Sequence, residues 1–197
     1  DIYADRFVFD KVDMPNYLPE TYVAAVAAAE AGQYDVLIFD SLSHEYIGAR
    51  GGLLSVVDAA KRAGSFSGWD VASPRHEAFI ERIIGARLHV IATMRQKKAY
   101  VQEESRGRTR VRVQGTEPVQ RDGMEFEFDV ILTIDAEHIA SVTKSRLQTI
   151  TAGGTQFVRP GREFALLALA DLNSGAEPGT RRDRPVDTAI GSGIVLS

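Results

Sequence analysis

The sequence predicts an α/β fold in which helices flank a mostly parallel β-sheet. Helical and extended patterns alternate along the chain, which is the arrangement of βαβ units. Two predicted strands, 35–39 and 88–94, are apolar at almost every position rather than at every second one. Strands that helices cover on both faces have this composition, so we expect both of them to be fully buried.

The first part of the chain predicts a strand, a helix and then the first apolar strand. Residues 6–13 alternate between polar and apolar side chains, as a strand does. Residues 19–31 form an Ala-rich helix that Pro19 opens and Gly32 closes. The strand 35–39 follows after a short connection.

Two helices separate this strand from the next one. Apolar residues recur at helical spacing over 53–60 and predict an amphipathic helix that ends at Gly64. Ser73 with Pro74 behind it predicts the N-cap and first turn of the second helix. The second apolar strand, 88–94, comes next.

The rest of the chain predicts a hairpin, two strands, a helix and a tail. The expected ranges are 100–113 for a basic hairpin with its turn at 105–107, 129–135 and 139–144 for two strands, and 162–173 for the helix. Residues 175–197 are rich in Gly, Pro, Arg and Asp, and we expect a mobile tail there. The core domain would then comprise residues 1–174.

The composition excludes several kinds of site. The chain of 197 residues has no cysteine, which excludes disulfides, thiolate metal sites and cysteine nucleophiles and is compatible with a cytoplasmic location. No apolar stretch approaches the length of a membrane span, so we expect a soluble protein. The net charge of −4 is unevenly distributed, because residues 95–121 contain eight basic and only three acidic residues.

Asp40 is the first candidate for a functional residue. The apolar strand ends at Asp40, and Ser41 and a small polar loop follow. Ligands of α/β sheets bind at the carboxyl ends of the strands, and a carboxylate there is well placed to hold hydrated Mg²⁺ on a nucleoside triphosphate. This is the pattern of a Walker B strand. The alternative is a structural Asp that caps the next turn.

Several motifs, taken in their order along the chain, resemble those of a known protein family. These motifs are YDVLIFDSLSH (34–44), SPRHEAFIERI (73–83), TMRQKKAYV (93–101), PVQRDGMEFEFD (118–129) and VTKSR (142–146). Together, over residues 2–175, they resemble the phage-type AAA ATPases with a RecA-like P-loop NTPase core, some of which act in single-strand annealing or recombination. The resemblance implies an oligomer, ring or filament, that binds ATP with Mg²⁺ and works on DNA.

One part of that family's pattern is missing. Such proteins begin with a strand, a GxxxxGK[ST] phosphate loop, a helix and a strand whose acidic residue polarises water, and residues 1–197 contain no such loop. We therefore expect the chain to be part of a longer protein, with buried strands left unpaired where this segment is absent. A chain without the loop is not expected to hydrolyse ATP by the usual mechanism.

The resemblance implies roles for residues at two strand ends. Asp40 would bind magnesium through water, with Ser41 in the same shell. Thr93 and Arg95 lie at the end of the second apolar strand, where RecA-like proteins place an amide that senses the terminal phosphate. Which residue of 93–95 senses the phosphate here is open, and Arg95 is the better electrostatic candidate because a guanidinium binds phosphate through two N–H groups. The alternative is a solvated Arg.

Lys144 and Arg146 form a second basic pair. They alternate along an extended segment and so project to one side. The resemblance implies that they reach the nucleotide of a neighbouring subunit, where positive charge stabilises the transferred phosphoryl group. The alternative is an exposed basic edge that discourages strand pairing.

The basic hairpin is the predicted contact with DNA, more specifically with single strands. Its candidate residues are Lys97, Lys98, Tyr100, Arg106, Arg108, Arg110 and Arg112. The last three alternate at the strand period, so they can meet successive phosphates from one face, and the tyrosine can stack on a base. The alternative is a solvated hairpin that Glu103 and Glu104 partly neutralise.

The remaining candidates surround Asp40 in the sequence. The four histidines show no i, i+4 metal spacing, but His44 is close enough to line the site. Glu45 is an alternative candidate for the base that polarises water.

From the motifs and the resemblance together, we interpret the chain as an ATP-binding and ATP-hydrolysing protein of phage DNA recombination or annealing. The alternative is a non-catalytic DNA-binding or assembly module.

Overall fold

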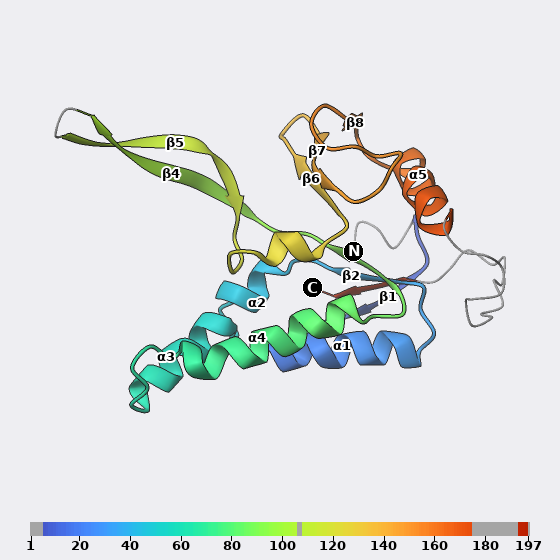
Figure 1. Cartoon of the computed structure of the whole chain (residues 1–197). Helices are drawn as coiled ribbons and strands as arrows, with labels where there is room; N and C mark the ends of the chain where they lie inside the picture. The colour runs from blue at the N-terminus through green and yellow to red at the C-terminus, as the bar shows by residue number, and fades with distance from the viewer. Residues whose placement is uncertain (1–5, 106–107, 175–192, 197) are drawn as a thin grey trace. The chain divides into compact units, whose positions relative to one another are not determined.

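The computed structural model describes residues 6–105, 108–174 and 193–196. They form two compact units. The first unit contains the described residues up to Asp122 together with the last strand, and the second begins at Gly123 (Figure 1). Each unit has its own small sheet and its own helices, and each is described by itself.

A four-stranded parallel sheet forms the centre of the first unit. Its strands are β1 (Phe9–Val12), β2 (Val36–Phe39), β3 (His89–Ala92) and β9 (Gly193–Leu196), in the order β1-β9-β2-β3. The helices of this unit are α1 (Pro19–Ala31), α2 (Ser43–Ile47), α3 (Leu53–Arg62) and α4 (Trp69–Ile84). Strands that alternate with helices and pair in parallel confirm the predicted α/β class.

One face of this sheet is covered better than the other. Leu37 and Phe39 of β2 are fully buried, whereas Ile38 is half-buried and Ile91 of β3 is 52% exposed. The ring of Tyr22 on α1 lies 5.3 Å from the ring of Phe39, so the helices pack against the face that carries the buried pair. The prediction that 35–39 and 88–94 are buried on both faces is therefore wrong in this structure.

Ion pairs join α1 to α4, which lie side by side (Figure 1). Arg75 binds both carboxylate oxygens of Glu20, at 2.5 and 2.7 Å. Arg82 binds Glu30 at 2.6 Å, and the backbone N–H of Arg87 donates to the same carboxylate at 2.7 Å. These hydrogen bonds lower the pKa values of Glu20 and Glu30. The two helices are thus held together by charge as well as by apolar packing.

Helix α4 begins earlier than predicted. Its N-cap is Gly68, which has a left-handed φ of 75°. Ser65 Oγ accepts a hydrogen bond from the Gly68 N–H at 2.8 Å and donates one to Asp70 at 2.6 Å. Ser73 is therefore not the N-cap and Pro74 lies inside the helix. The turn before Gly68 starts the helix first, and Pro74, the sixth helical residue, has no N–H to donate to the carbonyl of Asp70.

The position between β1 and β2 is filled from the far end of the chain. β9 pairs in parallel with both strands. We expected a mobile tail at 193–196 and unpaired strands in the sheet, and the structure has neither in this place. The apolar run 193–196 forms backbone hydrogen bonds with both β1 and β2. Residues 175–192 and 197 of the predicted tail lie outside the described residues.

The predicted hairpin is confirmed and is longer than expected. β4 (Gln96–Ser105) and β5 (Arg108–Pro118) pair antiparallel, with a register shift beside Ala99 and Tyr100. The two residues of its turn, 106 and 107, lie outside the described part of the chain. β4 begins directly after the segment that follows β3, so the hairpin grows out of the carboxyl edge of the parallel sheet.

The second unit is antiparallel. η1 (Met124–Glu127) precedes β6 (Val130–Ile134), β7 (Ile139–Ser145) and β8 (Gln156–Val158), which pair in that order, and α5 (Arg162–Asn173) follows. The two predicted strands and the helix are confirmed. They do not extend a mostly parallel sheet, because the connection from β6 to β7 is too short for a parallel crossover. In the described part of the chain, no helix is long and apolar enough to cross a membrane.

We predict that Glu30→Gln weakens the packing of α1 on α4. The substitution removes a charge that two donors stabilise, so the free energy of unfolding at pH 7 should fall by about 1 kcal/mol. Because the folded pKa lies below the ordinary 4.5, this stability is present above pH 4.5 and disappears as the pH falls through the folded pKa.

Urea denaturation at pH 7 and at pH 3 measures the difference between the two proteins. Glu77→Gln, at an exposed position of α4, is the matched control. An equal loss for both variants, or a loss that does not shrink in acid, would contradict the assignment.

Candidate functional site

The parallel pairing of β2 with β3 brings Asp40 and Thr93 together. Each residue directly follows its strand, and the strands pair with Phe39 opposite Ala92. Thr93 Oγ1 donates a hydrogen bond to Asp40 Oδ1 at 2.6 Å. The backbone closes the same corner, because the Leu42 N–H donates to the Thr93 carbonyl at 2.9 Å. Asp40 remains exposed, so its second oxygen is open to a ligand.

Ser41 contributes a buried hydroxyl next to this carboxylate. The residue is only 9% exposed, and its Oγ has no hydrogen-bond partner among the described residues. The Asp40–Ser41 peptide bond is cis. Because a buried hydroxyl without a partner is costly, this edge is suited to a polar ligand that supplies one.

The oxygen donors at this edge fit a hydrated magnesium ion. Asp40, Ser41 and Thr93 supply one carboxylate and two hydroxyl groups, which are the ligand types that Mg²⁺ and its waters prefer. Within the described ranges, no three His, Asp or Glu side chains gather closely enough to hold a metal by themselves. A magnesium ion here would therefore depend on water and phosphate oxygens for the rest of its shell.

Arg95 lies beside this edge and contacts His44. Its backbone N–H donates to Ser43 Oγ at 2.9 Å, and its guanidinium Nη2 lies 3.0 Å from His44 Nε2. Burial and the positive charge of Arg95 lower the pKa of His44 below the ordinary 6.5, although Asp40 acts in the opposite direction. His44 is therefore neutral at pH 7.

Tyr17 and Arg50 support His44. The ring of Tyr17 stacks on the imidazole with 4.8 Å between ring centroids. The Arg50 guanidinium lies 4.7 Å from the centre of the Tyr17 ring and donates to its hydroxyl at 2.5 Å. The sequence does not predict the contacts of Tyr17 and Arg50, since both lie outside the apolar strands and belong to no motif that points to them.

A buried polar network holds the short helix α2. Glu45 is 0% exposed, and its two oxygens lie 3.1 Å from His76 Nδ1 and 3.1 Å from Gln120 Nε2. Gln120 also donates to the Leu42 carbonyl at 2.9 Å. Both oxygens of Glu45 are thus occupied by protein donors, which favours a structural role over the alternative role as a water-polarising base.

Both ends of the hairpin are attached around this helix. Val119, just after β5, donates its N–H to the carbonyl of Arg95, just before β4, at 2.7 Å. Arg121 lies over the Trp69 ring at 5.3 Å and donates to Ser73 Oγ at 3.1 Å. The hairpin base is therefore fixed to the same elements that surround Asp40.

The candidate nucleic-acid residues are spread along the hairpin. Lys97 and Lys98 are exposed, and Lys97 pairs with Glu117 at 3.2 Å. For Tyr100, Arg108, Arg110 and Arg112 the structure describes the backbone, and Arg106 lies outside the described residues. The register places Arg110 opposite Glu103. DNA binding by this hairpin stays a prediction.

Lys144, in β7, and Arg146, directly after it, lie in the second unit, and both side chains donate to the Phe126 carbonyl. Lys144 Nζ donates to the carbonyls of Phe126 and Phe128, the latter at 2.8 Å. Arg146 donates to the Phe126 carbonyl at 2.9 Å and pairs with Asp129 at 3.2 Å. Partial burial and the charge of Arg146 lower the pKa of Lys144. Their predicted contact with a neighbouring nucleotide is untested, and in the chain itself they bind the end of η1.

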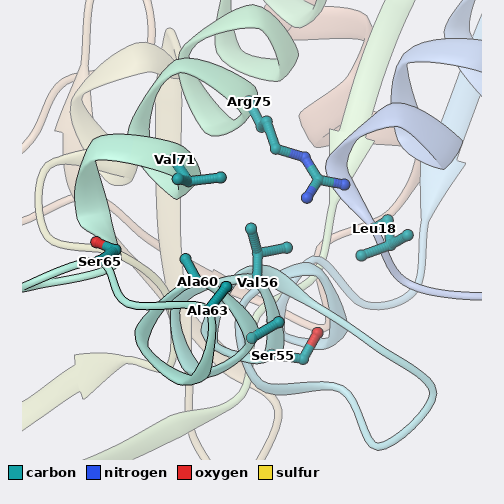
Figure 2. Close-up of a pocket in the computed structure, with 9 residues that line it drawn as sticks. Leu18, Ser55, Val56, Ala60, Ala63, Ser65, Val71 and Arg75 are labelled. Atoms are coloured by element: carbon teal, nitrogen blue, oxygen red, sulfur yellow. The ribbon is translucent and has the colours of Figure 1, made fainter.

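An open groove of about 580 Å³ lies between α3 and α4. Figure 2 shows Val71 and Arg75 on one side of it and Val56 and Ala60 on the other. Its walls are largely apolar, and none of its lining residues is a predicted site residue. Arg75 is already paired with Glu20. The groove therefore lacks the polar groups that would fix a charged ligand.

Comparison with known proteins identifies a family. A family model described as an AAA domain matches residues 3–157. No curated protein and no solved structure matches the chain significantly. The matched range covers β1 to the middle of β8 and includes Asp40, Thr93, Arg95 and the hairpin.

We predict that Glu45→Ala destabilises the first unit strongly. The change leaves His76 and Gln120 buried without their shared acceptor, which should lower the free energy of unfolding by about 3 kcal/mol. Urea denaturation measures the loss. Glu81→Ala, at an exposed position of α4, should cost less than about 0.5 kcal/mol. Similar losses for both variants would show that the buried network does not hold α2.

Proposed function

The chain belongs to the AAA domain family of P-loop NTPases, and from this premise we propose that its Asp40 edge binds ATP with Mg²⁺ and that the protein couples ATP hydrolysis to work on DNA. Family membership indicates ATP binding and hydrolysis. The observation that carries the assignment to this edge is the hydrogen bond between Thr93 and Asp40 at the carboxyl ends of two adjacent parallel strands.

Each residue of the edge has a proposed role. Asp40 holds the magnesium ion through a water ligand, and Thr93 Oγ1 fixes the orientation of the Asp40 carboxylate. Ser41 Oγ donates to the same hydration shell. Arg95 binds the terminal phosphate, for which its planar guanidinium offers paired N–H donors. When bound, Mg²⁺ neutralises charge on the phosphates.

A nucleic-acid role is proposed for the hairpin. The segment 95–121 has eight basic and three acidic residues in a chain of net charge −4, so positive charge is concentrated there. The hairpin base is joined to α2 by Gln120 and to Arg95 by Val119. This connection supports coupling between the nucleotide edge and DNA bound along the hairpin. The process we propose is phage-type recombination or single-strand annealing by a RecA-like homo-oligomer, with Lys144 and Arg146 reaching a neighbour's nucleotide.

A second candidate function is a DNA-binding or assembly module without catalysis. The observation that favours it is the concentration of eight basic and three acidic residues in 95–121, which can bind DNA without any chemistry at the Asp40 edge. Both functions use the basic hairpin, and they differ in whether the Asp40 edge receives magnesium and nucleotide.

Asp40→Ala should remove the magnesium dependence of nucleotide binding. We expect the wild-type chain to bind ATP about tenfold more tightly with Mg²⁺ than with EDTA, and the variant to show no such difference. Fluorescence titration with a labelled ATP measures both affinities. Asp58→Ala, an exposed aspartate of α3, should behave like the wild type. A wild-type chain whose ATP affinity ignores Mg²⁺ would refute the magnesium role and favour the non-catalytic module.

Replacing Arg108, Arg110 and Arg112 by Ala should flatten the salt dependence of DNA binding. Three lost phosphate contacts should reduce the slope of log K against log salt concentration by about 2 for single strands. Fluorescence anisotropy with a labelled oligonucleotide at several salt concentrations measures this slope. The control replaces Lys61 and Arg62, two exposed basic residues of α3. An unchanged slope in the hairpin variant would place the DNA contact elsewhere.

A further inference from the structure

We propose that His44 is a positioning residue that holds the guanidinium of Arg95 at the Asp40 edge by accepting its hydrogen bond. The inference rests on the proposed function, since the terminal phosphate is what Arg95 would bind. From the sequence alone, His44 is expected near Asp40 but has no specific role.

The Arg95 side chain needs a hydrogen-bond partner to hold its guanidinium in one orientation. Its backbone is fixed on both sides, because its N–H donates to Ser43 Oγ and its carbonyl accepts from Val119. Its side chain is exposed, and a long exposed side chain samples many rotamers. The 3.0 Å contact with His44 Nε2 selects among those rotamers. A guanidinium already directed loses less entropy when it binds phosphate.

The chemistry of this contact sets the state of His44. Arginine has donors and no acceptor, so Nε2 must carry the lone pair and Nδ1 the proton. The groups that face the imidazole are Arg95, Arg50, Asp40 and Tyr17. The two arginines and burial favour the neutral ring, and Asp40 favours the charged one. A protonated His44 would lose its acceptor and repel Arg95.

The surroundings of His44 make it the fixed member of the pair. One face of its ring stacks on Tyr17 at an angle of 18°. Arg50 holds Tyr17 through its hydroxyl and its ring. The next residue, Glu45, anchors α2 in the buried network with His76. His44 is thus held through its ring and its backbone, and the exposed Arg95 side chain adapts to it.

The first test is spectroscopic and needs no nucleotide. In the ¹⁵N-labelled full chain, the imidazole shifts of His44 should show the Nδ1–H tautomer and a pKa below 6.5. Arg95→Ala should raise that pKa, because it removes a positive neighbour. A proton on Nε2, or a pKa that ignores Arg95→Ala, would overturn the proposal.

The second test uses two substitutions that differ in reach. Gln places its amide oxygen near the position of Nε2, whereas Asn reaches only as far as Nδ1. We expect His44→Asn to weaken Mg-ATP binding about as much as Arg95→Ala, roughly tenfold, and His44→Gln to restore it to within about twofold. Combining His44→Asn with Arg95→Ala should add little, since both remove one interaction. His89→Ala, on an exposed histidine of β3, is the control.

The two tests separate the possible failures. If the wild-type chain does not bind Mg-ATP, the proposal that its own Asp40 edge binds nucleotide fails, and the spectroscopic test still decides whether His44 holds Arg95. If Mg-ATP binds but His44→Asn and His44→Gln behave alike, the function stands and the positioning role of His44 is overturned.

Discussion

The site depends on the register between β2 and β3. Because Phe39 pairs with Ala92, the next residues on the two strands, Asp40 and Thr93, meet at one edge and form their hydrogen bond. A slip of one residue would turn every side chain of a strand to the opposite face. It would bury the wrong set of side chains against α1 and separate the two polar groups. The apolar packing of β2 therefore determines the geometry of the polar edge.

A second constraint is the buried carboxylate of Glu45. A fully buried carboxyl group is tolerated only when hydrogen-bond partners surround it, and His76 and Gln120 supply those partners from α4 and from the end of the hairpin. Three segments must therefore be in place at once around α2. The same helix carries Ser43 and His44, which contact Arg95. Through these contacts the base of the hairpin, the Asp40 edge and α4 share one small element, which is the physical basis of the coupling that we propose.

Much of the fold could be predicted because its signals are local. The ranges 19–31 and 162–173 have the periodicity and end residues of helices, and the structure has helices at both. The predicted start of helix α4 was wrong, because Ser73 followed by Pro74 is a stronger local signal for an N-cap than Ser65 and Gly68. The turn at Ser65 and Gly68 starts the helix only through a hydrogen bond that forms in the folded chain. The place of β9 could not be predicted, since pairing between distant segments leaves no periodic pattern.

The sequence by itself determined that Asp40 ends an apolar strand, that Thr93 and Arg95 lie at the end of another, and that a basic hairpin comes next. The apolar composition of the strands and the clustering of basic residues in the sequence indicate these three features. Only the tertiary structure decided that Glu45 is a buried anchor, that Thr93 binds Asp40 and that His44 contacts Arg95. Those facts depend on contacts between residues far apart in the chain, such as Glu45 with Gln120. The physical reason is that burial and hydrogen-bond partners are properties of the packed molecule, whereas periodicity is a property of the chain.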